Sequence, residues 1–407
     1  MGAAFSAETR EWLAAADLAE RKRLGQYMTP RPIRDSLIDR LELAPGMRVL
    51  DPGAGTGEFL ASVAEREPSA SLTGWDADAG ILRHAARNVP GATLEHRSAL
   101  EPYEGTPFDL VIGNPPYFQF RATPEQRERF RRVISGRPNV FALFFQASIE
   151  ATRSGGQVAF VVPPSMNNGA YFEALRNFIV ESGSIEHLEL LKGNDLFEDA
   201  STAAQLIVIR VGSSGDGFHL RRRCAEAGFS RTIFSTDPEA LAGEFEGRAT
   251  LWELGYEAVT GTVVWNQHRE RLAREDGEGT VPLIWAHNIE DGQLVLRTEH
   301  KRPQFVRGQA AVLRGPALVV NRVVGAVGKG VLRAALVPDG MEFVAENHVN
   351  VILPRAGAGP ILGWEGLLAA LRSPGVAPRV RRLTGNTQIS ARELTHLLPV
   401  TGRDRAH

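Results

Sequence analysis

The first half of the chain alternates between two hydrophobic patterns. Short apolar runs typical of buried strands occupy residues 47–50, 71–76, 93–97, 108–113, 157–162, 185–191 and 206–211. Between them, apolar residues recur with helical spacing at 6–23, 32–41, 79–88, 139–152 and 171–181. Strands that alternate with helices indicate a doubly wound, mainly parallel sheet. We therefore expect an open α/β sheet with helices on both faces.

The pattern changes after residue 211. Residues 212–217 form a cluster rich in Gly and Ser, as is typical of a linker. Beyond it, β-like runs are short and helices few: the runs lie at 262–265, 294–296, 317–320 and 349–353, and the helical patterns near 364–371 and 391–397. A chain of 407 residues fits two domains. We predict one domain over residues 1–212 and a mixed α+β domain over residues 213–407.

Composition limits the class of protein. The net charge is −2 and 43% of the residues are hydrophobic, so the chain can form a core and is not uniformly basic. Cys224 is the only cysteine, which excludes an intrachain disulfide and a metal site made of several cysteines, and we expect no metal. No apolar run approaches the roughly 20 residues of a membrane span and no signal peptide opens the chain, so we expect a soluble, cytoplasmic protein without a membrane partner.

Two segments are locally basic. Residues 292–338, the basic stretch, contain eight Lys or Arg and a single acid, Glu299. A second group of arginines surrounds a helix that we expect to begin at Thr123. Each group is either a solvated charged face or a surface for phosphates. The candidate phosphate contacts are Arg121, Arg127, Arg131, Arg302, Arg307 and Arg322.

A Gly-rich turn follows the first predicted strand. Residues 51–57 read Asp-Pro-Gly-Ala-Gly-Thr-Gly and lead into a helix, so their backbone N–H groups can face a ligand. Leu60 stands where a dinucleotide fingerprint needs its third glycine. Asp76 ends the second strand and can accept both hydroxyls of a ribose, whereas we expect Asp78 to cap the next helix. These features predict a nucleoside ligand without a diphosphate.

The segment Asn-Pro-Pro-Tyr follows the strand at 108–113. Two consecutive prolines can continue neither a strand ladder nor a helix, so residues 114–117 leave the strand as a stiff extended segment. Taken alone, this is equally well a Pro-rich turn after a buried strand. Its place at the carboxyl end of a strand, where open α/β sheets bind ligands, favours an active site.

In this order and spacing, these motifs resemble the adenine-specific DNA methyltransferases of restriction–modification systems, in the gamma motif order. The resemblance covers residues 20–211 with strong motifs, and residues 262–266 and 388–394 with weaker ones. It implies a Rossmann-like methyltransferase sheet, a C-terminal DNA-recognition domain and S-adenosylmethionine as cofactor. The implied partners are double-stranded DNA and a cognate restriction endonuclease that acts separately.

The resemblance also assigns a cofactor site. It implies that Thr29 contacts the cofactor carboxylate, that Asp51 lies near the methionine amino group and that Phe144 flanks the adenine. Ser98 departs from the pattern, because the family usually has Asp at this position, which accepts a hydrogen bond from the adenine amine. A hydroxyl accepts without charge, so we expect weaker cofactor binding or another acceptor. The implied cofactor residues are Thr29, Asp51, Gly53, Gly55, Asp76, Ala77, Ser98, Ala99, Pro116 and Phe144.

The implied reaction is methyl transfer to the exocyclic amine of a flipped adenine. The Asn114 side-chain oxygen and the Pro115 carbonyl would accept hydrogen bonds from the two N–H groups of the amine, so that the nitrogen lone pair becomes available. Tyr117 and Phe197 would replace the stacking that the base loses on leaving the duplex. The implied catalytic residues are Asn114, Pro115, Pro116, Tyr117 and Phe197.

Other functions fit the same motif. Enzymes that methylate RNA adenines or protein glutamines also act on a planar nitrogen. Protein glutamine methyltransferases generally lack a trailing domain of this size with a basic stretch. A catalytically inactive binding protein would not need the intact segment 114–117. A fused nuclease site at Asp291 and residues 299–301 rests on a short pattern that occurs by chance.

Overall fold

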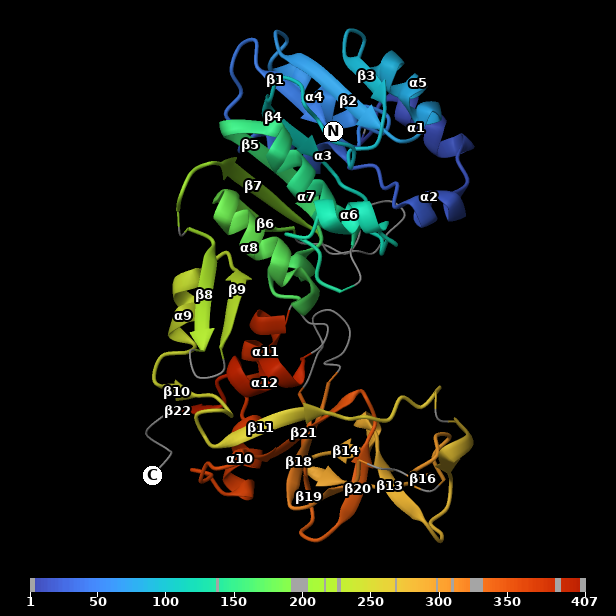
Figure 1. The fold of residues 1–407 in the computed structure, drawn as a ribbon. Coiled ribbons are helices and arrows are strands. Elements are labelled where there is room, and N and C mark those ends of the chain that lie inside the picture. The colour runs from blue at the N-terminus through green and yellow to red at the C-terminus, as the bar shows by residue number, and fades with distance from the viewer. Residues whose placement is uncertain are drawn as a thin grey trace. The chain divides into compact units, whose positions relative to one another are not determined.

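The computed structural model describes residues 4–136, 139–191, 204–215, 217–224, 228–267, 269–297, 299–308, 311–322, 332–384 and 389–402. Its contacts divide the chain into two compact units (Figure 1). The first unit consists of Met1–Arg222 and Arg231–Pro238, and the second of Arg223–Ser230 and Glu239–His407. Within the described ranges, no helix combines the length and apolarity needed to cross a membrane.

The first unit is built on a sheet of seven strands. Their order is β3 (Thr93–His96), β2 (Ser71–Asp76), β1 (Arg48–Asp51), β4 (Phe108–Gly113), β5 (Thr152–Val162), β7 (Gln205–Val211) and β6 (Gly183–Leu190). Neighbours from β3 to β5 are parallel, and β7 runs antiparallel to both β5 and β6. The predicted doubly wound, mainly parallel sheet is confirmed.

Helices cover both faces of this sheet (Figure 1). They are α1 (Ala7–Ala15), α2 (Leu18–Leu24), α3 (Arg31–Ile38), α4 (Glu58–Arg66), α5 (Ala79–Asn88), α6 (Pro124–Arg129), α7 (Val140–Ala151) and α8 (Glu173–Ser182), with 3-10 turns at Pro164–Asn167 and Ala170–Phe172. Successive strand residues point to opposite faces. Thus Val111 of β4 packs in the cluster that contains Phe141 of α7, whereas Leu110 and Ile112 pack in the cluster that contains Leu60 of α4.

Local signals fixed several helix ends. Asp78 caps α5 by accepting a bond from the Gly80 N–H, as predicted. Thr123 and Gln126 form a complete capping box at α6, also as predicted. The single helix predicted over residues 6–23 is wrong: α1 ends at Ala15 and α2 begins at Leu18. The Asp17 side chain accepts from the Glu20 N–H (2.8 Å), so an unrecognised cap starts a second helix there.

The second unit contains two larger sheets. One has the order β11 (Tyr256–Thr260), β21 (Val349–Pro354), β18 (Ala317–Asn321), β19 (Ala334–Val337), β15 (Gln293–Leu294) and β14 (Ile289–Glu290). The other has the order β12 (Leu272–Ala273), β16 (Phe305–Arg307), β13 (Thr280–Ile284), β20 (Glu342–Ala345) and β17 (Leu313–Arg314). Val319, Phe343 and Val351 lie in the core that these strands share. The runs at 317–320 and 349–353 are strands, as predicted.

Short elements complete the fold. They are β8 (His219–Cys224) paired with β9 (Phe229–Phe234), β10 (Arg248–Ala249) paired with β22 (Thr401–Gly402), α9 (Pro238–Gly243), α10 (Trp364–Leu371), α11 (Val376–Thr384), α12 (Ala391–His396), and 3-10 turns at Arg269–Arg271 and Ala286–Asn288. The strand predicted at 262–265 is wrong, because Val263 forms only an isolated bridge with Glu346. The mixed α+β character of this part of the chain is confirmed.

Candidate active site

Three polar residues lie at one edge of the first sheet. Asp51 ends β1, Asp76 ends β2 and Asn114 follows β4. The strands β2, β1 and β4 are parallel neighbours, so their carboxyl ends lie side by side. This edge borders a pocket of about 530 Å³, a size that suits a small molecule. The predicted residues that line it are Thr29, Asp51, Gly53, Gly55, Asp76, Ala77, Ser98, Ala99, Asn114, Pro116 and Phe144.

Two predicted catalytic residues are not among the lining residues of this pocket. They are Pro115 and Tyr117, which flank Pro116 in the same segment. Phe197 lies outside the described residues. Sequence reasoning also missed apolar residues of the wall, among them Ile81, Phe118 and Phe120. Phe118 and Phe120 come just after the Asn-Pro-Pro-Tyr segment, so the sequence already placed them near the site. No local pattern, however, distinguishes an apolar residue of a pocket wall from one of the core.

The Gly-rich turn brings backbone close to the pocket. Gly55 and Gly57 have φ angles of 53° and 82°, a region that favours glycine. A Cβ on Gly53 would lie 3.5 Å from a ring carbon of Phe144, which α7 contributes to the pocket wall. The turn therefore leaves space between strand β1 and the aromatic ring that a side chain would begin to fill.

Asp51 is a buried acid. Only 2% of its surface is exposed, and a carboxyl oxygen accepts from the Gly53 N–H at 3.1 Å. Burial and, to a smaller extent, the neighbouring charge of Asp76 raise the pKa of Asp51 to about 8, although the hydrogen bond from the Gly53 N–H opposes the shift. We find no ion pair between Asp51 and any residue that the structure describes. A buried carboxyl group beside a pocket can stabilise a cationic ligand group.

Asp76 is held by backbone. One oxygen accepts from the Gly55 N–H and the other from the Asp78 N–H, both at 2.9 Å. Burial raises the pKa of Asp76, although these hydrogen bonds oppose the shift. Ser98 also lines the pocket, and its hydroxyl oxygen accepts from the Leu100 N–H at 3.2 Å. Each acceptor oxygen retains a lone pair for a further donor.

Residues 25–29 pack against the Asn-Pro-Pro-Tyr segment. Gly25 has a φ of 67°, and a Cβ there would lie 3.1 Å from Pro116, Tyr117 and Phe118 atoms. The Asn114 amide nitrogen donates to the Tyr27 carbonyl at 3.0 Å. This bond fixes the orientation of the amide, so that its oxygen is free to accept from another group.

The Tyr117 hydroxyl meets two acceptors. It donates to the Asn114 side-chain oxygen and lies 2.6 Å from the Val161 carbonyl oxygen. The Tyr117 ring stands edge-on to Phe141, with centroids 6.2 Å apart. Burial raises the pKa of this phenol, so it stays protonated as a donor. The sequence indicated neither contact, and stacking of Tyr117 on a base stays a prediction.

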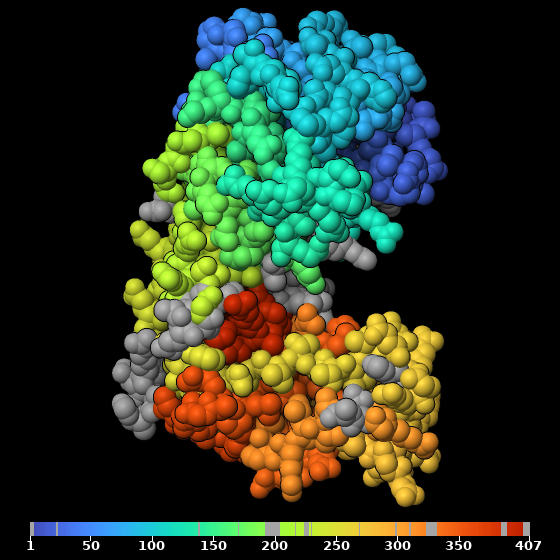
Figure 2. Space-filling model, viewed as in Figure 1, coloured from blue at the N-terminus to red at the C-terminus, as the bar shows by residue number. Residues whose placement is uncertain are grey.

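The arginines near α6 differ in their surroundings. Arg121 and Arg127 are exposed, and we find no ion pair from either to a described residue. Arg131 is exposed but pairs with Glu128. Arg129 donates to the Leu100 carbonyl at 2.9 Å and so supports the pocket wall. In the space-filling view, the teal part of the chain that contains α6 forms surface of the first unit (Figure 2).

The basic stretch is equally mixed. Arg302 is exposed, with its guanidinium 4.9 Å from the Trp285 ring centroid. Arg307 is exposed on β16. Arg322 instead donates to the Asn347 carbonyl at 3.2 Å, and its Nε is buried. Arg322 is therefore built into the fold of the second unit, whereas Arg302 and Arg307 can meet a partner.

One group of side chains has the spacing of metal ligands. Possible ligand atoms of Glu8, Glu11 and His84 lie within 4.8 Å of one another. Arg87 pairs with both acids, at 2.6 Å from Glu8 and 3.6 Å from Glu11. The Arg87 guanidinium already pairs with both carboxylates, so the group serves to join α1 and α5.

Comparison with known proteins confirms the predicted resemblance to the methyltransferases of restriction–modification systems. Residues 85–197 match the sequence profile of the Eco57I restriction-modification methylase family. The chain is 29% identical over 212 residues to the modification methylase CviBIII of Paramecium bursaria Chlorella virus NC1A, an alignment that covers 50% of this chain and 54% of that protein. The chain therefore matches only about half the length of that relative.

Two further relatives align over more of the chain. The type II methyltransferase M.BsuBI of Bacillus subtilis is 24% identical over 442 residues, covering 93% of this chain and 87% of the relative. The type II methyltransferase M.TthHB8I of Thermus thermophilus is 26% identical over 336 residues, covering 75% and 76%. The similarity to restriction–modification methylases thus extends into both units.

Proposed function

We propose that this chain is an S-adenosylmethionine-dependent DNA methyltransferase that modifies the exocyclic amine of adenine in double-stranded DNA, and that it is the modification enzyme of a restriction–modification system. The observation that carries the proposal is the oriented Asn114 amide at the carboxyl end of β4, beside the pocket. The similarity to restriction–modification methylases supports it. A cognate endonuclease would act as a separate protein.

The pocket residues fit the proposed cofactor. The Thr29 hydroxyl oxygen is buried without a hydrogen-bond partner in the described structure, and it can donate to a carboxylate. Asp51 is a buried acid that can face an ammonium group, and Asp76 can accept from ribose hydroxyls. Phe144 can lie against an adenine ring. When bound, S-adenosylmethionine supplies an electrophilic methyl group on its sulfonium.

The protonation of Asp51 makes cofactor binding depend on pH. In the free protein Asp51 holds its proton at pH 7, because its pKa of about 8 lies above that pH. An ammonium group beside it favours the carboxylate, so binding should release a proton. We expect the association constant for S-adenosylhomocysteine to rise by about one log unit per pH unit between roughly pH 6 and 7.5.

Isothermal titration calorimetry in buffers of different ionisation enthalpy would measure that proton release directly. Asp51→Asn is the matched variant, because it keeps the shape of the side chain but cannot ionise. It should bind more weakly at pH 7.5 and lose the pH dependence. An equal slope in wild type and variant would show that Asp51 does not face the ammonium group.

The residues of the Asn-Pro-Pro-Tyr segment supply the catalytic groups. The Asn114 side-chain oxygen and the Pro115 carbonyl can each accept an N–H of the target amine, which shifts its lone pair out of conjugation with the ring. The Tyr117 hydroxyl already donates to the Asn114 oxygen, and the second lone pair of that oxygen can accept from an entering amine. No nucleophilic side chain is required, because the amine itself attacks the methyl carbon and then loses one of its two protons to solvent.

DNA is the substrate that the second unit favours. A base inside a duplex cannot reach a pocket at a strand edge and must be flipped out. Exposed Arg302 and Arg307 can contact phosphates, as the second unit of a DNA enzyme requires. RNA adenine or protein glutamine methylation remains the alternative, and the alignment with M.BsuBI over both units supports DNA.

Expression in a host that lacks adenine methylation tests the function. Single-molecule sequencing of plasmid DNA from these cells should show N6-methyladenine at one short motif, and none with Asn114→Ala. Methylation on cytosine would contradict the adenine assignment alone. Unmodified DNA together with labelled RNA or protein, after incubation with methyl-labelled cofactor, would support the alternative and overturn the proposal.

A further inference from the structure

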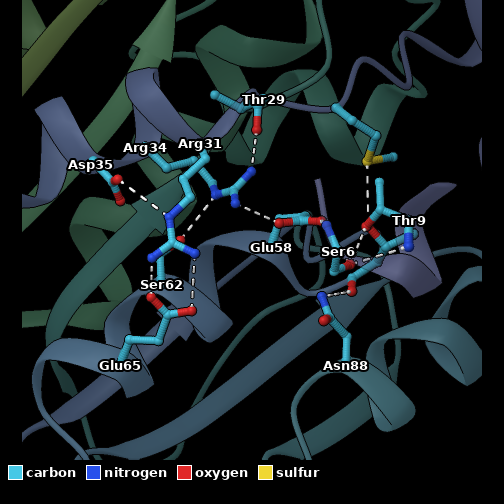
Figure 3. Close-up of polar contacts among 12 residues, drawn as sticks. Ser6, Thr9, Thr29, Arg31, Arg34, Asp35, Glu58, Ser62, Glu65 and Asn88 are labelled. Carbon is cyan, nitrogen blue, oxygen red and sulfur yellow. Dashed lines mark hydrogen bonds and ion pairs between the residues drawn. The ribbon is translucent and has the colours of Figure 1, made fainter. Parts of the chain in front are cut away.

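A buried ion pair lies behind the cofactor pocket. Arg34 on α3 and Glu58, the first residue of α4, have side chains only 4% and 6% exposed, and their closest nitrogen and oxygen are 2.6 Å apart (Figure 3). Removing two charges from water is costly, and an apolar pair of similar volume is often as stable or more so. The pair therefore calls for a role other than stability alone.

All three guanidinium nitrogens of Arg34 have partners. Besides the bond to Glu58, Nε donates to the Ser62 hydroxyl at 3.0 Å, and Nη1 donates to the Thr29 carbonyl at 2.5 Å (Figure 3). These contacts join α3 and α4 to the backbone of residues 25–29. A lysine could not make them together, because its single nitrogen lacks the planar fork.

Glu58 connects the pair to the N-terminal helix. Its second carboxylate oxygen accepts from both the backbone N–H and the hydroxyl of Ser6, each at 2.9 Å. Ser6 is the N-cap of α1, and Thr9 of that helix lies 2.7 Å, hydroxyl to hydroxyl, from Thr56 in the Gly-rich turn (Figure 3). The same carboxylate thus holds α1 and orients Arg34, and Glu58 is among the residues that line the pocket.

These contacts fix the position of Thr29, which lines the pocket. Arg34 binds the Thr29 carbonyl. The Thr29 hydroxyl oxygen is buried and has no hydrogen-bond partner among the described residues. Two residues earlier, Tyr27 accepts from the Asn114 amide. The segment is therefore fixed at one end by the ion pair and at the other by the proposed catalytic amide.

We propose that Arg34 and Glu58 are positioning residues, which hold Thr29 so that its hydroxyl binds the carboxylate end of the methionine moiety. This rests on the proposed function, since it assumes a cofactor with that moiety. The ion pair then determines affinity for one end of the ligand and leaves the nucleoside end, which Asp76 and Phe144 contact, unaffected.

Two ligands distinguish binding at the methionine end from binding at the nucleoside end. S-adenosylhomocysteine carries the amino and carboxylate groups, and methylthioadenosine lacks both. In Arg34→Met/Glu58→Leu, which replaces the buried charges with apolar side chains, we expect the dissociation constant for S-adenosylhomocysteine to rise about tenfold or more, as for the loss of one charge-assisted hydrogen bond. The dissociation constant for methylthioadenosine should stay within about twofold.

The matched control is Arg31→Met/Glu65→Leu. This pair joins the same two helices, but its side chains are 41% and 51% exposed (Figure 3). It should leave both dissociation constants and the melting temperature nearly unchanged. Arg34→Lys provides a second test if the double variant does not fold, because it keeps the charge and loses the fork, and it should show the same selective loss.

The outcomes are distinct. Equal weakening of both ligands, or no weakening in a folded variant, would overturn the positioning role. Wild-type protein that binds neither ligand would overturn the proposed function and this inference with it. Wild-type protein that binds both, together with variants that do so equally well, would leave the proposed function standing and remove the inference alone.

Discussion

Asn114→Ala should lower the rate of methyl transfer roughly 100- to 1000-fold, the usual cost of removing one preorganised dipole from a transition state. The amide is oriented before substrate arrives, because its nitrogen is bound to the Tyr27 carbonyl at 3.0 Å. Its oxygen is the acceptor that alanine removes. Single-turnover kinetics with a methyl-labelled cofactor and plasmid DNA would measure the rate, and a rate within a few-fold of wild type would contradict the assignment.

The affinity for cofactor should distinguish Asn114→Ala from Asp76→Ala. Asn114→Ala should keep the dissociation constant for S-adenosylhomocysteine close to that of wild type, since other residues supply the polar groups proposed to bind the cofactor. Asp76→Ala should show the opposite pattern and bind more weakly by about 1.5–3 kcal/mol. It will also lower the melting temperature, because Asp76 accepts from the Gly55 and Asp78 N–H groups.

Reversing three exposed arginines of the second unit, Arg269, Arg302 and Arg307, to Glu should weaken DNA binding strongly and flatten its salt dependence. Each phosphate contact contributes about 0.9 to the slope of log K against log salt, so three lost contacts should lower it by nearly three. The guanidinium of Arg269 lies 5.0 Å from the Trp265 ring centroid, and that of Arg302 lies 6.0 Å from it. Fluorescence anisotropy over a salt series would measure both quantities.

A charge-matched control distinguishes the loss of these three contacts from a general change in net charge. Arg10, Arg23 and Arg83 are exposed on α1, α2 and α5, and reversing them changes the net charge equally. This control should preserve the slope. Arg322 is left out, because its side chain supports the Asn347 backbone and its loss would disturb folding. If the folded triple variant keeps affinity and slope, the arginines near α6 become the better candidate for the DNA-binding surface.

The sequence by itself determined the first sheet and the edge that carries the chemistry. Apolar runs bounded by Gly and Pro identify strands from their own residues, and the run at 108–113 coincides with β4. Parallel strands end at a common edge, so the sequence alone predicts that Asp51, Asp76 and Asn114 lie at one pocket. Caps such as Asp78 and Thr123 are equally local, because their side chains bind backbone a few residues away.

Only the tertiary structure decided which charged residues are buried. Arg34 and Glu58 lie on amphipathic helices where a charge is normally solvated, and their pairing depends on α3 packing against α4. In the same way, Arg322 looked like Arg302 in sequence, yet one supports a backbone carbonyl and the other is exposed.

Contacts between distant segments were also beyond local patterns. The bond from Asn114 to Tyr27 spans 87 positions, and the strands β13 and β16 pair through residues that have no strong period of their own. A residue type and its near neighbours report the local backbone preference, whereas burial and partners depend on which elements become neighbours when the core forms. This is why the edge of the sheet was predictable, but the ion pair behind Thr29 was not.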